Sequence, residues 1–199
     1  MILRPNFAQD APPTHVEVGG FSYPVRVDFR VWVQIVDALE EWIAEPADDI
    51  QAEHNAALFA QVQQLAFGGI LAEEDPAQVL AAIAGFAKGY PSAGGGEADA
   101  GERVYSFGSD LNAIVIAIRN QTGLDLSYRR REPFHWWEFL LEFQTLCGEH
   151  YILNLMEARG YRGDDAQMQR RRRMCALPER RTEADAARLQ AINGMFYNA

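Results

Sequence analysis

The sequence predicts a mainly α-helical fold, a bundle-like single domain with a small N-terminal β-hairpin. Apolar residues recur at helical spacing through most of the 199 residues, and Asp, Gly and Pro stand where helices would begin and end. Two alternating runs around Gly19-Gly20 are a good signal for paired strands. A chain of this length can bury one core of ordinary size.

Three segments set the expected domain organisation. Residues 1–14 are proline-rich and unpatterned, so we expect a flexible arm there. Residues 15–199 are expected to form the single, mostly helical domain. Within it, residues 90–102 (YPSAGGGEADAGE) predict a long Gly-rich surface loop, because Gly, Ala, Ser and acidic residues cannot build a core.

The hairpin and the first helix occupy residues 15–45. A tight turn at Gly19-Gly20 requires positive φ, and Pro24 cannot donate to a ladder, which favours an edge strand. Asp28 is expected to cap a helix that Pro46 ends. One face of that helix is apolar and is expected to lie inward: Phe29, Trp32, Val33, Val36, Leu39 and Ile43.

Two more helices are predicted before the loop. One begins at Asp48 or Asp49 and stops at Gly68-Gly69. The next opens at Asp75-Pro76 and closes at Gly89, since proline fits the first helical turn. Their inward residues are expected to be Leu58, Val62, Leu65, Val79, Leu80, Ile83 and Phe86.

Residues 105–160 hold two of the four tryptophans and the densest run of large apolar residues, so we expect the chain to be organised around them. Ser109 or Asp110 is expected to cap the first of three helices, and Gly123 to stop it. Pro133 marks the expected start of the second helix. Short links imply antiparallel neighbours around one core. The third helix is expected to run from Glu149 to Arg159 and to end at Gly160.

The C-terminal part predicts one longer and one shorter helix. Asp164-Asp165 opens a helix with four arginines in its middle, and Pro178 breaks it. Residues 183–193 predict a last helix, followed by an apolar tail. The candidates for partner binding in this part are Arg170, Arg171, Arg172, Arg173, Met195 and Phe196.

Charge is distributed unevenly along the chain. Residues 1–100 carry 4 basic and 15 acidic residues, a net charge of -11, whereas residues 101–199 carry 14 basic and 13 acidic residues, a net charge of +1. The acidic half makes general nucleic-acid binding an unfavourable interpretation, because attraction to phosphate scales with net basic surface. We therefore expect Arg170–Arg173 to form a solvated face that pairs with the acidic helices, within the chain or between copies.

No motif in the sequence predicts catalysis, a metal or a cofactor. There is no GxSxG, HExxH or phosphate loop, and the four histidines lack metal-ligand spacing. His135 beside Trp136-Trp137 could be a titrating switch, but we favour a partly buried histidine at a helix start. For the tryptophans we favour packing in the core. The paired carboxylates are expected to be helix caps or to lie on solvated faces. Cys147 and Cys175 are expected to be buried free thiols inside helices. The protein is expected not to be an enzyme.

Three motifs resemble the bacteriophage Gp15 family, across roughly residues 15–180. The long loop at 90–102 and the arginine-rich C-terminal region depart from that pattern. The resemblance rests on Asp28-Phe29-Arg30, on Asp110 with Gly123-Leu124-Asp125-Leu126, and on His135-Trp136-Trp137.

The resemblance implies a tail assembly chaperone in the cytoplasm of the bacterial host. Such a protein would keep a helical tape-measure protein soluble until tail tube subunits polymerise around it, and self-association is a further expectation. A helical client implies an apolar groove, for which the apolar tail and the first helix are candidates. No apolar run in the sequence is long enough to span a membrane.

Two alternatives belong to other functional classes. A structural virion protein, such as a tail-completion or head–tail connector subunit, would be favoured by a ring with a stable self-interface. A nucleic-acid-binding regulator using Arg170–Arg173 would be favoured by DNA retention that depends steeply on salt.

Overall fold

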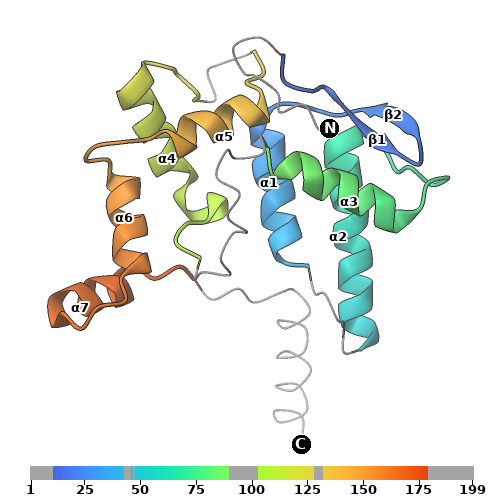
Figure 1. The fold of residues 1–199 in the computed structure, drawn as a ribbon. Coiled ribbons are helices and arrows are strands. Elements are labelled where there is room, and N and C mark those ends of the chain that lie inside the picture. Colours follow the sequence, from blue (N-terminus) through green and yellow to red (C-terminus); the bar gives the residue numbers. More distant parts are fainter. Residues whose placement is uncertain (1–10, 43–45, 47, 90–102, 128–131, 179–199) are drawn as a thin grey trace, which may run out of the picture.

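The computed structural model describes residues 11–42, 46, 48–89, 103–127 and 132–178. Within these ranges the fold is mainly α-helical with one N-terminal hairpin, which confirms the predicted fold class (Figure 1). The elements are β1 (His15–Val18), β2 (Phe21–Pro24), α1 (Phe29–Glu40), α2 (Asp49–Phe67), α3 (Pro76–Ala87), α4 (Phe107–Thr122), α5 (Trp136–Gln144), α6 (Tyr151–Gly160) and α7 (Ala166–Met174).

The hairpin forms where the sequence predicts it. β1 and β2 pair antiparallel, with Val18 opposite Phe21 and His15 opposite Pro24. Gly19 and Gly20 both have positive φ, at 59° and 87°, which explains the glycine pair at the turn. The turn is fixed to α3, because the Gly19 amide donates to the Gln78 side chain at 3.1 Å.

Helix α1 is the centre of the molecule. Asp28 caps it by accepting from the Arg30 amide at 2.9 Å, as predicted. The helix contacts α2 and α3 on one side and α4 and α5 on the other. Because it is covered on both sides, Ile35 is fully buried although it lies off the predicted inward face. The chain is therefore organised around α1 as much as around residues 105–160.

The predicted end of α1 at Pro46 is wrong, since the helix ends at Glu40. Its last turn tightens: the amides of Glu41 and Trp42 donate to carbonyls three residues back, at 3.1 and 3.3 Å. Ile43 lies outside the described residues.

Helices α2 and α3 have the predicted boundaries. Asp48 caps α2 and Asp75 caps α3, which has Pro76 in its first turn. Gly68 ends α2 with a φ of 79°. The inward faces are also confirmed for Leu58, Val62, Val79, Ile83 and Phe86, which are buried, whereas Leu65 and Leu80 are only partly buried.

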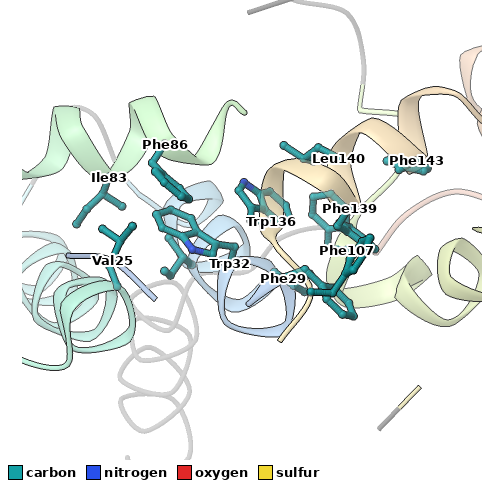
Figure 2. Packing of buried hydrophobic residues seen from close by; sticks show 14 of the residues in the cluster. Val25, Phe29, Trp32, Ile83, Phe86, Phe107, Trp136, Phe139, Leu140 and Phe143 are labelled. Carbon is teal, nitrogen blue, oxygen red and sulfur yellow. The ribbon is translucent and has the colours of Figure 1, made fainter. Parts of the chain in front are cut away.

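An aromatic layer joins α1 to α3, α4 and α5 (Figure 2). Trp32 stacks on Phe86 with ring centroids 4.4 Å apart, and Phe29 stacks on Phe139 at 4.6 Å. Offset stacking of this kind adds to the area that the rings bury. The layer makes one continuous core out of segments from both halves of the sequence.

Helix α4 begins earlier than predicted. Its N-cap is Ser106 instead of Ser109 or Asp110, because Phe107 is drawn into the aromatic layer and the first turn follows it. Asp110 lies in the first turn of α4 and is 5% exposed. Its carboxylate accepts a hydrogen bond from the Ser106 amide at 3.0 Å. Gly123 ends α4 with a φ of 79°, as predicted.

Helix α5 begins at Trp136, so the predicted start at Pro133 is wrong. The residues before it stay extended because they pair with the segment that leads into α1. The Phe29 amide donates to the Phe134 carbonyl at 2.9 Å, and the Trp136 amide donates to the Val27 carbonyl at 2.7 Å. Sequence periodicity does not report this long-range pairing.

Both cysteines are free, but neither lies inside a helix. Cys147 is exposed after α5, and Cys175 is partly exposed at the end of α7, so the prediction of buried thiols is wrong. Most of the arm (residues 1–10), the loop at 90–102 and the predicted helix at 183–193 lie outside the described residues. Among the described helices, none has the length and apolar character to cross a membrane.

Candidate partner-binding surfaces

An open groove lies between α4, the start of α6 and the segment that follows α7. Its volume is about 670 Å³. Three large apolar side chains line it while remaining exposed: Ile116 at 49%, Tyr151 at 69% and Met174 at 77%. We call this the α4 groove. Exposed apolar side chains gathered at one hollow are typical of a surface that binds another molecule.

The floor of the α4 groove is a buried ion pair between α4 and α6. Arg159 donates to both carboxylate oxygens of Asp110, at 2.6 and 3.1 Å. Its remaining donors reach the Val104 carbonyl at 3.0 Å and the Cys175 carbonyl at 2.6 Å. This bidentate pair fixes the start of α4, the end of α6 and the end of α7 to one another.

A second hollow of about 390 Å³ lies on the other side of Ile116. Phe29, Leu111, Val115 and Leu126 contribute its apolar lining, and Arg119 lies at its edge. Ile116 is therefore an apolar ridge between two hollows. A helix packed along α4 could cover this ridge, in the manner of amphipathic helices that bind in apolar grooves.

No pattern in the sequence predicts the α4 groove. Leu111, Ile114, Val115 and Ile118 follow the i, i+3, i+4 and i+7 spacing of one helical face, and Ile116 lies away from that face. This apolar residue off the apolar face is the signal that the sequence offers. Tyr151 and Met174 are single apolar residues in polar surroundings, which periodicity alone does not mark as exposed.

Helix α7 carries the four arginines on an exposed element. None of its residues is buried, and it packs against α6. Arg170, Arg171 and Arg173 are exposed, and Arg172 is partly buried between two hollows. Helices α2 and α3 lie on the opposite side of the molecule from α7 (Figure 1), so this helix does not face their acidic residues in the described part of the chain. Pairing of the arginine run with acidic helices of another copy stays a prediction.

The remaining candidates either lie outside the described residues or belong to the core. Met195 and Phe196 lie outside the described residues. Trp136 is 1% exposed within the aromatic layer. The indole N–H groups of Trp136 and Trp137 donate to the last carbonyls of α3, those of Ala87 and Phe86, each at 2.9 Å. The tryptophans therefore hold α3 in place, which confirms the interpretation as core packing.

His135 is the N-cap of α5, which confirms the favoured interpretation of this residue. Its Nδ1 accepts from the Trp137 amide at 3.0 Å, so Nε2 carries the proton and donates to the Pro13 carbonyl at 2.9 Å. Burial lowers the pKa of His135, and the opposing effects of the Pro13 hydrogen bond and the Glu138 charge do not reverse the shift. The fold therefore requires the neutral imidazole of His135, because only an unprotonated Nδ1 can accept the hydrogen bond from the Trp137 amide.

A family model described as Bacteriophage Gp15 protein matches residues 72–180. Three motifs carry the resemblance to this family. The match includes two of them, Asp110 to Leu126 and His135 to Trp137, and does not include the motif that begins at Asp28. No curated protein and no solved structure gives a significant match. Since the match covers more than half of the chain, the protein belongs to the bacteriophage Gp15 family and is a phage structural or assembly-related protein.

Proposed function

We propose that this protein is a tail assembly chaperone that binds an apolar helical segment of the tape-measure protein in the α4 groove. The observation that carries the proposal is the gathering of Ile116, Tyr151 and Met174 at one hollow. A long helical client exposes apolar faces until the tail tube surrounds it. A binding protein that covers such a face lowers the free energy of the soluble client, because apolar area is removed from water.

The rigid floor of the groove supports this role. Asp110 and Arg159 are buried and neutralise each other's charge, so the pair shapes the hollow without offering an unpaired charge to the client. The apolar ridge can then contact a client helix without desolvating a lone ion. The net charge of -10 supports the role too, because it favours solubility of the complex.

Co-expression with the tape-measure protein tests the proposal. We expect the tape-measure protein to be insoluble alone and to co-elute with this protein in size-exclusion chromatography with light scattering. Ile116→Asp should abolish co-elution, because it places a charge on the apolar ridge. Ile70→Asp is the matched control, since Ile70 is 59% exposed but lies away from the groove.

Two outcomes would replace the proposal. If both isoleucine variants retain the client equally, the α4 groove is not the binding surface. If no complex forms and the protein alone assembles into a discrete ring, a structural virion subunit becomes the better interpretation.

A further inference from the structure

The α4 groove has two distinct ends. At one end, Arg159 is hydrogen-bonded to Asp110 near the start of α4 and to the Cys175 carbonyl that follows α7. At the other end lie Asn120, near the end of α4, and Tyr151, the first residue of α6. Because an α-helix rises about 1.5 Å per residue, the groove runs for about 15 Å along α4 from Asp110 to Asn120.

The last residues that the structure describes lie at the rim of this groove. Met174, Cys175, Ala176 and Pro178 line it, and Ala176 and Pro178 also line a hollow of about 230 Å³ beside Arg159. Figure 1 shows α7 beside the end of α6 and away from its start. The segment that follows Pro178 is therefore attached to the protein at the Arg159 end of the groove.

The sequence after Pro178 separates charged residues from apolar ones. Residues 179–188 contain no large apolar side chain, whereas residues 189–197, which we call the C-terminal segment, contain Leu189, Ile192, Met195, Phe196 and Tyr197. The helix that the sequence predicts over residues 183–193 would be about 16 Å long, close to the length of the groove. Leu189 and Ile192 would share one face of it, because they are three residues apart.

We propose that the C-terminal segment covers the α4 groove of its own chain when no client is bound. Residues 179–182 separate Pro178 from the predicted helix, and four residues can span up to about 13 Å. That reach is enough to start the helix over the Arg159 end of the groove. Leu189 then lies over Ile116, and the residues after it reach Tyr151.

Apolar contact and attachment to the rim both favour this occupant. Ile116, Tyr151 and Met174 are exposed by 49%, 69% and 77%, so a covering segment removes apolar area of each from water. A segment tethered by a short link has an effective concentration of about 1 mM at its site. The same segment of a second copy reaches that concentration only in a very concentrated solution, so we assign the contact to one chain.

The contact gives the groove a means of regulation. This consequence rests on the proposed function, whereas the contact itself needs no client. The C-terminal segment would keep the apolar side chains of the groove out of water in the free protein, where an exposed patch favours aggregation. A client helix would displace it, because both cover the same side chains.

Hydroxyl-radical footprinting of the full chain, read by mass spectrometry and made without the tape-measure protein, tests the proposal. Met174 and Tyr151 report on the groove. Phe21, which is 66% exposed on the hairpin, is the internal reference for an intact fold. In Leu189→Asp/Ile192→Asp we expect labelling of the two groove residues to rise by about fivefold or more, because two apolar contacts are replaced by charges.

The matched control is Ala187→Asp/Gln190→Asp. It adds the same charge to the same segment, but on the opposite face of the predicted helix. Its labelling at Met174 and Tyr151 should stay at the wild-type value. Labelling of Phe21 should be the same in all three proteins.

Two results would overturn the proposal. Equal labelling of the groove residues in the wild-type protein and in Leu189→Asp/Ile192→Asp would show that the segment does not cover the groove. Protection that is lost on dilution would assign the contact to a second copy. Concentration-independent protection together with unchanged client capture by Leu189→Asp/Ile192→Asp would support the contact and would instead contradict the proposed place of the client.

Discussion

Arg159 connects three parts of the molecule through one guanidinium group. It is 8% exposed, and its donors reach Asp110 and the carbonyls of Val104 and Cys175. A buried cation of this kind is stable only while its partners remain, since desolvation of an unpaired charge is costly.

We therefore predict that Asp110→Ala lowers the free energy of unfolding by about 3–5 kcal/mol, because it leaves Arg159 buried and unpaired. Urea titration followed by circular dichroism measures this change. Asp164→Ala is the control, since Asp164 is exposed beside a helix cap and its loss should change stability by less than about 0.5 kcal/mol. Equal effects of the two substitutions would contradict the role given to the ion pair.

His135 makes stability depend on pH. Because its pKa is lowered in the folded state, the unfolded chain takes up a proton first as the pH falls below the ordinary histidine value of about 6.5. The contribution of His135 is therefore complete above that pH and is lost as the pH falls toward the folded pKa. Protonation of Nδ1 would also remove the acceptor for the Trp137 amide.

We predict that stability falls between about pH 7.5 and 5.5, and that His135→Asn reduces the fall. Asparagine keeps an oxygen that can cap α5 but does not titrate. Urea titrations of both proteins at the two pH values measure the difference. An identical pH dependence in the variant would show that other groups are responsible.

At the scale of elements, helix starts could be predicted wherever a local cap decides them. Asp28, Asp48, Asp75 and Asp165 each accept an amide of the first turn, as their positions in the sequence indicate. The starts of α4 and α5 were misplaced because distant residues decide them. Phe107 packs against α5, and the segment before Trp136 pairs with residues that lead into α1.

The candidate surfaces were only partly predictable for the same reason. The arginine run is local and could be read from the sequence. The α4 groove combines Ile116, Tyr151 and Met174 from three separate segments. Only the folded arrangement of α4, α6 and the end of α7 brings them together.

Helix α7 should be the least stable of the described helices, because it buries no side chain and is held by α6 and the Arg159 bond to Cys175. We predict that its amides exchange with solvent well before those of α4, which contributes Phe107, Ile114 and Ile118 to the core. Hydrogen exchange with mass spectrometry measures both. Similar protection of α7 and α4 would indicate a partner that covers α7.

At the scale of the whole molecule, the proposed client contact is mainly apolar. Ile116, Tyr151 and Met174 gather at the α4 groove, which is assigned to the client. Client binding should therefore respond weakly to salt, because burial of apolar area is not screened by ions.

Site-specific photocrosslinking tests the central claim most directly. A photoreactive phenylalanine analogue would replace Ile116 in the α4 groove or Ile70 outside it, and each variant would be irradiated after co-expression with the tape-measure protein. Our account predicts a crosslink to the tape-measure protein from position 116 and none from position 70. A crosslink from position 70 alone, or equal crosslinking from both, would contradict the assignment of the α4 groove.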